Sequence, residues 1–404
     1  MLFMNIPSRS EFDQNHPVRT AVIKVASRCN LACTYCYIYE MADQSWRRQP
    51  QVIDTTTIEA IAKRLAEYAQ YRSLSALIVV AHGGEPLLIG PERLAHFFTT
   101  ISHGLDTVGC ETHLGVQTNG TLLSMEAVQK LKSRKVHIGI SLDGPPKVND
   151  EHRVDKHGIG TSGAVLDGLS RLREATNSRP LLGGFLSYAD ISVPPIVQLD
   201  YFIELGAAQV DFLFPNFNHD TLPKEYRNGA LGRWMIQLFN LWMDRSNQLE
   251  VRTFTVIMRL LLGGKFGYES FGAESQKTIA VEPDGTYHAS DVLKSAYEGV
   301  TSTGMDVWHH EIREVESMPL IAATSSKAVS AANECLACPI FSVCGGGLVA
   351  HRYSKAQGFN RVSVYCEDIK LLVRHIMDRL KKELMGRPDV TVSVSSFSAY
   401  SHRV

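Results

Sequence analysis

The sequence predicts an α/β fold, a partial (β/α)6 barrel followed by a second, smaller domain. Two observations lead to this prediction. In the first half of the chain, short apolar runs alternate with amphipathic stretches of helical length, which is typical of a parallel sheet with crossover helices. From about residue 275 the pattern becomes irregular and cysteine-bearing. The chain of 404 residues is also longer than one ordinary core accommodates.

Six apolar runs are the predicted strands. In chain order they are Ala21–Ala26, Ala76–Ala81, His113–Thr118, Val136–Ser141, Leu181–Leu186 and Val210–Phe214. Between and after them lie the predicted helices Thr56–Tyr71, Pro91–Ser102, Met125–Ser133, Gly163–Ala175, Pro195–Leu205, Leu231–Leu249 and Ser363–Met385. Because crossovers between parallel strands are right-handed, such a series favours closure into a barrel.

Four segments divide the chain by pattern and composition. Residues 1–19 are a polar N-terminal segment, 20–250 are the predicted barrel, 251–330 are a connecting region, and 331–404 are a cysteine-bearing domain with a C-terminal helix. The tail after Gly386 is rich in Ser and Val, so we expect an edge strand or disorder there. No repeat of the solenoid kind is present in the sequence.

Composition excludes several classes of protein. A hydrophobic fraction of 44% with 21% charged residues is ordinary for a globular protein, and a net charge of −1 gives no electrostatic reason to expect nucleic acid or an anionic membrane. The first residues lack the apolar core of a signal peptide, and no apolar run is long enough to span a bilayer. Eight cysteines without a secretion signal indicate metal ligands in a reducing cytosol. We therefore expect a cytoplasmic protein without nucleic-acid or membrane partners.

Cys29, Cys33 and Cys36 directly follow the first predicted strand. Thiolates are the usual ligands of iron–sulfur clusters, and three of them leave one iron of a four-iron cluster open to a ligand that is not protein. A structural zinc ion would need a nearby fourth ligand, whereas Cys110 and His82 lie far along the chain. Three merely buried or reactive thiols are the alternative. The position at the carboxyl end of a strand, where α/β barrels build their sites, favours the cluster.

This C-x3-C-x2-C run, with the aromatic Tyr35 before its last cysteine, resembles the signature of radical S-adenosylmethionine (SAM) enzymes. In that family the open iron of a [4Fe–4S] cluster binds SAM. An electron from the cluster cleaves SAM to a 5′-deoxyadenosyl radical, which abstracts hydrogen from the substrate. The resemblance implies an oxidoreductase whose core is a partial barrel. It also implies an electron donor such as flavodoxin or ferredoxin.

A glycine pair and a carboxylate follow the second predicted strand. Gly83, Gly84 and Glu85 match the Gly-Gly-Glu-Pro motif with which the radical SAM family holds the SAM ammonium group. Paired glycines allow a ligand to approach the backbone closely, and Glu85 can accept hydrogen bonds from an amine. An ordinary loop is the alternative, but the position next to the cysteine loop favours the binding role.

Polar residues also end the third and fourth predicted strands. Ser141 and Arg153, twelve positions apart, form a hydroxyl–guanidinium pair suited to a carboxylate. Sulfatase-maturing radical SAM enzymes and their relatives grip the SAM carboxylate with such a pair. Gln117 and Asn119 also match those relatives, which implies contact with the ribose or methionyl part. A polar strand-to-helix turn is an equally good interpretation of Gln117 and Asn119.

Cys335, Cys338, Cys344 and Cys366 have the number and spacing of a ligand set for one metal centre, either zinc or a four-iron cluster. The spacing resembles the SPASM domain of peptide-modifying radical SAM enzymes, in which seven cysteines hold two auxiliary clusters. Here Ser290 and Leu348 replace ligands of the nearer cluster, while the outer set is complete. The resemblance therefore implies one auxiliary [4Fe–4S] cluster, fully ligated by protein, for electron transfer or scaffolding.

Asp291 follows the lost ligand at residue 290. In the sulfatase-maturing relatives an aspartate at this place faces the substrate and accepts a proton. The resemblance thus makes Asp291 a candidate catalytic residue. A surface aspartate in a turn is the alternative.

The wider sequence resembles the cyclophane-forming peptide maturases over roughly residues 20 to 375. The segments that carry this resemblance are 24–29, 39–48, 291–297, 344–353 and 364–366. Those enzymes mature ribosomally made precursor peptides (RiPPs) by joining an aromatic ring carbon to the β-carbon of a residue two positions away. We therefore expect this crosslink, formed after the deoxyadenosyl radical takes a β-hydrogen.

Other functions stay open at this point. A maturase could form a thioether or another crosslink, or it could oxidise a Ser or Cys side chain to formylglycine, although the missing auxiliary ligands count against the latter. A non-catalytic iron–sulfur or zinc scaffold would keep the cysteines but would not need Glu85, Ser141 and Arg153. No fused leader-binding domain is expected ahead of Cys29.

Overall fold

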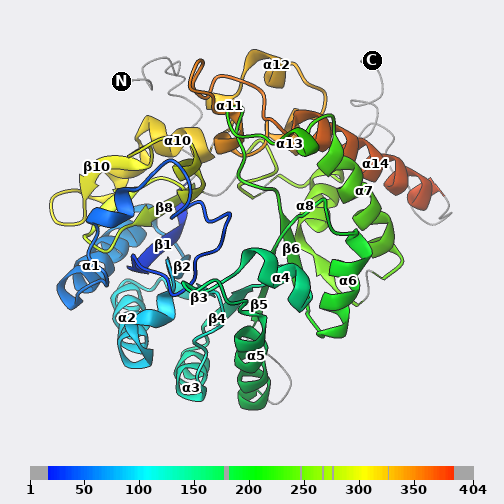
Figure 1. Ribbon diagram of the computed structural model, residues 1–404. Coiled ribbons are helices and arrows are strands. Elements are labelled where there is room, and N and C mark those ends of the chain that lie inside the picture. The colour runs from blue at the N-terminus through cyan, green and yellow to red at the C-terminus, as the bar shows by residue number, and fades with distance from the viewer. Residues whose placement is uncertain are drawn as a thin grey trace. The chain divides into compact units, whose positions relative to one another are not determined.

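The computed structural model describes residues 17–176, 182–245, 248–265, 268–274, 277–325 and 327–385 (Figure 1). They fall into two compact units, to the extent that their residues are described. The sheet unit comprises Gln14–Tyr188 and Lys277–Ile321, and the helical unit comprises Ala189–Gln276 and Ala322–Val404. The tail after Gly386 and nearly all of the N-terminal segment 1–19 lie outside the described residues. The four-segment division drawn from the sequence stays a prediction.

A parallel sheet forms the centre of the sheet unit, and this confirms the predicted α/β class. Neighbouring strands among β1 to β5 pair in parallel, so their carboxyl ends lie at one edge. The strands are β1 (Val18–Ala26), β2 (Ala76–Gly83), β3 (Glu111–Thr118), β4 (His137–Ser141) and β5 (Leu182–Tyr188). Each lies within a few residues of a predicted strand. Residue 181, the first of the predicted fifth strand, lies outside the described residues.

The other side of this sheet comes from residues 277–306, which the sequence pattern does not identify as strands. β8 (Lys277–Val281) pairs in parallel with β1 and antiparallel with β9 (Thr286–His288), and β9 pairs antiparallel with β10 (Ser302–Asp306). The signal present was Asp284-Gly285 between β8 and β9, because Asp-Gly favours hairpin turns. Gly285 has φ +84°, which only glycine adopts easily.

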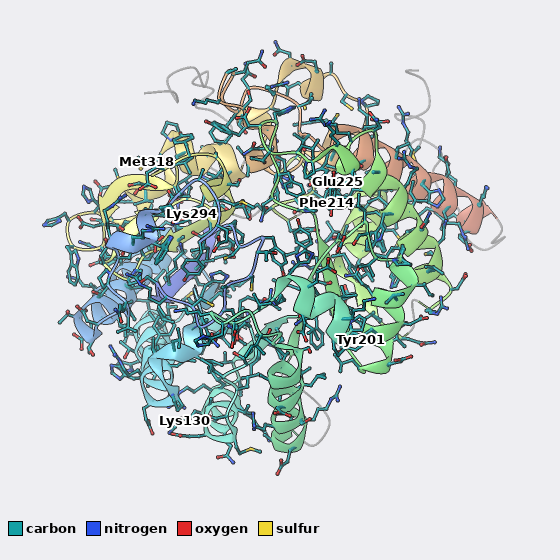
Figure 2. The ribbon with its side chains drawn as sticks, in the orientation of Figure 1. Lys130, Tyr201, Phe214, Glu225, Lys294 and Met318 are labelled. Atoms are coloured by element: carbon teal, nitrogen blue, oxygen red, sulfur yellow. The ribbon has the colours of Figure 1, made fainter. Side chains whose placement is uncertain are left out.

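Helices connect the parallel strands and bury their apolar faces. They are α1 (Thr55–Arg72), α2 (Pro91–Asp106), α3 (Met125–Ser133), α4 (Pro146–His152) and α5 (Ser162–Thr176). Caps fix where they begin: Asp54 accepts a hydrogen bond from the Thr57 amide at α1, and Ser124 accepts one from the Ala127 amide at α3. On the outer side, Lys130 of α3 pairs with Glu92 of α2 at 2.7 Å (Figure 2).

Shorter elements complete the sheet unit. They are the 3-10 helices η1 (Ser45–Arg48), η2 (Pro86–Ile89) and η4 (Asp291–Ser295), and the helix α9 (Ile312–Glu316). The helix α10 (Pro319–Ser325) follows α9 in the chain. The described helices include none that is long and apolar enough to cross a membrane.

Helices dominate the helical unit, which also holds the parallel pair β6 (Gln209–Leu213) and β7 (Glu250–Val251). Its helices are α6 (Pro195–Glu204), η3 (Lys224–Tyr226), α7 (Ala230–Met243), α8 (Arg252–Leu261), α11 (Lys327–Ser330), α12 (Asn333–Leu336), α13 (Phe341–Cys344), η5 (Val349–Arg352) and α14 (Cys366–Met385). α14 packs on α7 and α8. Gly232 permits this contact, because a Cβ there would lie 2.6 Å from the Asp368 backbone.

Candidate functional site

The loop after β1 brings Cys29, Cys33 and Cys36 together at the carboxyl edge of the sheet. The Cys36 amide donates to the Cys33 carbonyl at 3.1 Å, and the Leu31 amide donates to Cys29 Sγ at 3.4 Å. Burial raises the pKa of Cys29 to about 12 and that of Cys36 to about 11. Three such thiols lose their protons together only beside added positive charge. The irons of a cluster would supply that charge, so the loop fits such a group.

Glu85 is fully buried next to this loop. Its carboxylate accepts hydrogen bonds from the Thr118 hydroxyl at 2.7 Å, the Asn119 amide at 2.7 Å and the Leu87 amide at 3.0 Å. Burial nevertheless raises its pKa. A cationic amine from a ligand would offset the cost of burying this charge, which fits the role predicted for Glu85.

The two glycines before Glu85 have a packing reason of their own. A Cβ at Gly83, where φ is +133°, would lie 2.0 Å from the Ala26 carbonyl oxygen. A Cβ at Gly84 would lie 2.3 Å from the Arg28 carbonyl oxygen. Both positions therefore require glycine because the end of β2 lies directly against the cysteine loop. Contact between these glycines and SAM stays a prediction.

Arg153 lies in a stacked, hydrogen-bonded group. It is 8% exposed, and its Nη1 donates to the Tyr35 hydroxyl at 2.9 Å. Tyr35 donates to Asp143, and its ring stacks on Tyr188 with the centroids 4.3 Å apart. Within the described part of the chain, the Arg153 Nε has no hydrogen-bond acceptor. A buried guanidinium with an unused N–H fits a carboxylate ligand.

Gln117 and Ser141, predicted from separate strands, meet in the structure. Gln117 Nε2 donates to Ser141 Oγ at 2.9 Å, and its side chain lies over Gly139. Asn119 Nδ2 donates to the Asn30 side chain at 2.9 Å, so Asn119 holds the cysteine loop. That is the structural role the sequence left open for Asn119. Contacts of all three residues with SAM stay predictions.

Asp143 and Tyr188 are site residues that the sequence pattern does not single out. Asp143 accepts hydrogen bonds from Tyr35 and from the Tyr188 amide, the latter at 3.0 Å. The available signal was its position two residues after Ser141 at the same strand end. Nothing local marks Tyr188, because its stacking on Tyr35 depends on the pairing of β4 with β5.

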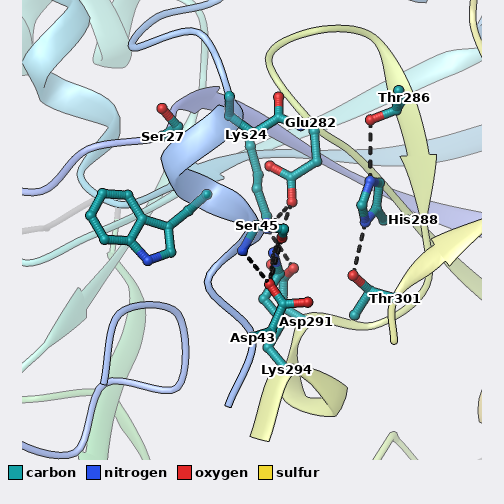
Figure 3. Close-up of polar contacts among 12 residues, drawn as sticks. Lys24, Ser27, Asp43, Ser45, Glu282, Thr286, His288, Asp291, Lys294 and Thr301 are labelled. Atoms are coloured by element: carbon teal, nitrogen blue, oxygen red, sulfur yellow. Dashed lines mark hydrogen bonds and ion pairs between the residues drawn. The ribbon is translucent and has the colours of Figure 1, made fainter. Parts of the chain in front are cut away.

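Asp291 begins η4 and is 8% exposed, so the alternative of a surface aspartate is wrong. Lys24 Nζ lies 2.6 Å from Asp291 Oδ1 and 2.6 Å from Glu282 Oε1 (Figure 3). Lys294 Nζ lies 3.1 Å from Glu282 Oε1 and 3.7 Å from Asp43 Oδ1. We call these five residues the Lys24 cluster. All five are buried in the sheet unit.

The sequence does carry a signal for this cluster, although the motifs did not reveal it. Lys24 interrupts the apolar strand β1, and a lysine in a buried strand must be paired. Its partner Glu282 lies 258 positions away. Only the pairing of β8 with β1 shows that the two meet.

In the helical unit, Cys335, Cys338, Cys344 and Cys366 line one cavity of about 50 Å³. They come from the short helices α12 and α13, the turn between them and the start of α14. Among the residues that the structure describes, no three His, Cys, Asp or Glu side chains are placed to hold a single metal ion. Four thiols around a shared cavity, without the tight set that zinc needs, fit a larger group such as a four-iron cluster.

Buried cations accompany these thiols. Arg352 is fully buried and donates to the carbonyls of Gly345 at 2.8 Å and Gly346 at 3.0 Å. Lys327 is also fully buried, and its Nζ has no hydrogen-bond partner among the described residues. Burial, together with Arg352, lowers the pKa of Lys327 to about 7. An anionic group on the four cysteines would offset this buried positive charge, so these residues also fit a thiolate-bound cluster.

The remaining predicted positions have ordinary surroundings. Ser290 precedes η4, next to Asp291, and Leu348 is a buried apolar residue before η5. Cys110 is buried in the turn after α2. Burial raises its pKa, as expected of an inert core thiol.

Solved structures share this fold. Native anSMEcpe with bound AdoMet and Cp18Cys peptide superposes with a TM-score of 0.76 at 20% sequence identity, covering 90% of this chain and 98% of that one. Streptococcus suis SuiB bound to precursor peptide SuiA gives a TM-score of 0.57 at 15% identity, covering 86% of this chain and 76% of that one. At these identities the likeness shows the fold.

Curated relatives match nearly the whole chain. The cysteine-type anaerobic sulfatase-maturating enzyme of Clostridium perfringens is 24% identical over 90% of this chain and 97% of its own length. The serine-type anaerobic sulfatase-maturating enzyme of Klebsiella aerogenes is 26% identical over 88% of this chain and 85% of its own. The predicted cyclophane crosslink is therefore wrong, because the relatives are sulfatase-maturating enzymes.

The structure gives a physical reason for this correction. The segment 24–29 contains Lys24 of the cluster and the start of the cysteine loop. The segment 344–353 contains Arg352 and the glycines whose carbonyls it binds. These segments hold the cysteine sites in place, so likeness in them reports the shared architecture and not the bond that is formed.

The family comparison agrees with the site. Residues 23–189 match the family model of the radical SAM superfamily. This range contains the cysteine loop, Glu85 and the group around Arg153. Residues 23–189 thus form a radical SAM core, and the chain is an enzyme of the radical SAM superfamily.

Proposed function

We propose that this enzyme oxidises the side chain of a cysteine or serine in a peptide substrate to the aldehyde of formylglycine. Its relatives of both kinds, cysteine-type and serine-type sulfatase-maturating enzymes, support this reaction. The observation that carries the proposal is Asp291, a buried carboxylate ion-paired at 2.6 Å in the same unit as the cysteine loop. Oxidation of CH–XH to C=X needs a proton acceptor, and Asp291 can serve as one.

The proposed cofactors are SAM and two [4Fe–4S] clusters. Cys29, Cys33 and Cys36 would hold the first cluster, and Cys335, Cys338, Cys344 and Cys366 would hold the auxiliary one. The residues proposed to contact SAM are Tyr35, Gly83, Gly84, Glu85, Gln117, Asn119, Ser141 and Arg153. When bound, these groups supply the one-electron chemistry, namely abstraction of a β-hydrogen and removal of one further electron.

The protein's own residues bind, orient and move a proton. Arg153 would pair with a carboxylate through its unused Nε, and Glu85 would accept hydrogen bonds from an amine. Asp291 would take the proton from the substrate sulfur or oxygen. An external donor such as flavodoxin or ferredoxin would supply electrons. We place the enzyme in the cytoplasm, as the cysteine content predicts.

Anaerobic reconstitution tests this function directly. The enzyme is incubated with SAM, a reductant and peptides that carry Cys, Ser or Ala at one central position. We expect 5′-deoxyadenosine together with an aldehyde that a hydrazine reagent traps on the Cys or Ser peptide, and none on the Ala peptide. A crosslinked product that the hydrazine does not trap would contradict the proposed oxidation.

A further inference from the structure

We propose that Lys24 is a positioning residue, which holds Asp291 as the proton acceptor and sets the pH range in which Asp291 can act. The inference rests on the proposed function, since it concerns the proton that leaves the substrate. Three features carry it: the bridge that Lys24 forms, the charge of the Lys24 cluster, and the neutral groups around it.

One ammonium group bridges two carboxylates from separate segments. Lys24 Nζ lies 2.6 Å from Glu282, just after β8, and 2.6 Å from Asp291, at the start of η4 (Figure 3). The three side chains are only 3%, 3% and 8% exposed. Because screening by water is weak at such burial, the bridge fixes where Asp291 lies.

The Lys24 cluster has one more carboxylate than it has ammonium groups. Its two cations, Lys24 and Lys294, face the three anions Asp43, Glu282 and Asp291. A buried cluster with surplus negative charge favours uptake of one proton. The cluster can therefore take the proton that the oxidation releases.

The contacts indicate which carboxylate takes it. Glu282 pairs with both ammonium groups, and despite burial they lower its pKa to about 2. Asp43 accepts from the Ser45 amide at 2.9 Å and the Gly299 amide at 2.6 Å, and its pKa is also lowered. Asp291 Oδ1 has only the ion pair with Lys24 and, within the described chain, no hydrogen bond of good angle. The proton therefore goes to Asp291.

Two histidines and a tyrosine face the cluster without adding charge. His82, on β2, is the register partner of Lys24, and burial lowers its pKa. Burial also lowers the pKa of His288 on β9, whose ring nitrogens lie 2.8 Å from Thr301 Oγ1 and 3.1 Å from Thr286 Oγ1 (Figure 3). Tyr39 near Glu282 stays neutral because burial raises its pKa. Near neutral pH, Lys24 is thus the cation that favours the ionised form of Asp291.

Lys24→Met tests the inference through the ratio of trapped aldehyde to 5′-deoxyadenosine, measured from pH 6 to pH 9. Without the ammonium, Asp291 keeps its proton up to a higher pH. We expect the ratio to fall about tenfold at neutral pH and its pH profile to move up by about 1–3 units. Deoxyadenosine should still form, because Lys24 acts after SAM cleavage.

Two further variants separate charge from structure. Lys24→Arg keeps a cation that can pair with two carboxylates, so it should restore most of the ratio and the original profile. Lys277→Met removes another buried lysine of the same sheet, on β8, and should leave the profile unchanged. If Lys24→Met lowers the iron content, the Lys24→Arg profile still decides the matter, since the inference requires it to match that of the wild type.

Two results would overturn the inference. One is a Lys24→Met profile that superposes on that of the wild type, and the other is an equal shift in Lys277→Met. Failure of the proposed function itself shows differently, since the wild type would then give no trapped aldehyde at any pH.

Discussion

The two cysteine sites differ in what surrounds their thiols. Around the three cysteines of the sheet unit lie a buried carboxylate, Glu85, and a guanidinium, Arg153, with an unused N–H. Around the four cysteines of the helical unit lie the buried cations Lys327 and Arg352. The first site offers groups that match both ends of an amino acid, whereas the second offers only positive charge. The first is thus suited to admit a ligand, and the second to retain an anionic group.

Removing one thiol from each site breaks the comparison most strongly. Cys33→Ala should abolish SAM cleavage while leaving about four of about eight irons per chain, because the four-cysteine set is complete without it. Cys338→Ala should lose the other half of the iron and still cleave SAM. Iron analysis and 5′-deoxyadenosine assays measure both effects, with Cys110→Ala as a matched control that loses neither. Loss of all iron in Cys33→Ala would show that the sites are not independent.

Arg153→Ala tests whether the first site admits a carboxylate. The substitution would leave that carboxylate unpaired in a largely desolvated site, which costs about 2–5 kcal/mol for buried charge pairs. SAM binding, measured by equilibrium dialysis on reconstituted enzyme, should weaken correspondingly at normal iron content. The exposed Arg47 serves as the matched control, and Arg47→Ala should bind SAM normally. Equal affinities in the two variants would rule out this role for Arg153.

The sequence predicts those parts of the fold and site that depend on residues close together in the chain. The strands β1 to β5 and the loop of Cys29 to Cys36 follow from local patterns, and both form as expected. The Lys24 cluster and the Tyr35–Asp143 contact do not, because their partners are 258 and 108 positions apart. Residues 277–306 join the sheet only by pairing with β1, a partner that no local pattern identifies.

Glu282→Gln sharpens the comparison at the Lys24 cluster, since it removes a charge from a site that depends on balanced charges. The folded state lowers the pKa of Glu282 to about 2, so the stability that it contributes is present above its unfolded pKa of about 4.3. That contribution is lost as the pH falls toward 2. At pH 7 the variant should lose about 3–5 kcal/mol in urea unfolding, as expected when a buried pair is broken.

The exposed Arg48–Glu298 pair provides the control for this change. Its side chains are 70% and 46% exposed, so Glu298→Gln should cost less than about 1 kcal/mol. The difference between the two variants should narrow steadily below pH 4.5. A Glu282→Gln deficit that stays constant down to pH 3 would mean that packing, and not charge, holds this residue in place.

The smallest expected effect concerns the positive charge beside the four cysteines. Reduction adds an electron to a group that is already anionic, so a nearby cation favours the reduced form. Lys327→Met removes a fully buried cation, and the midpoint potential of the auxiliary centre should become more negative while that of the first centre stays unchanged. Lys370 lines the same cavity but is partly exposed, so Lys370→Met should shift the potential less because water screens its charge. Redox titration followed by electron paramagnetic resonance measures both. A shift in Lys370→Met as large as that in Lys327→Met would mean that burial does not strengthen the effect of this charge, and the contrast between the two cysteine sites would then rest on their carboxylates alone.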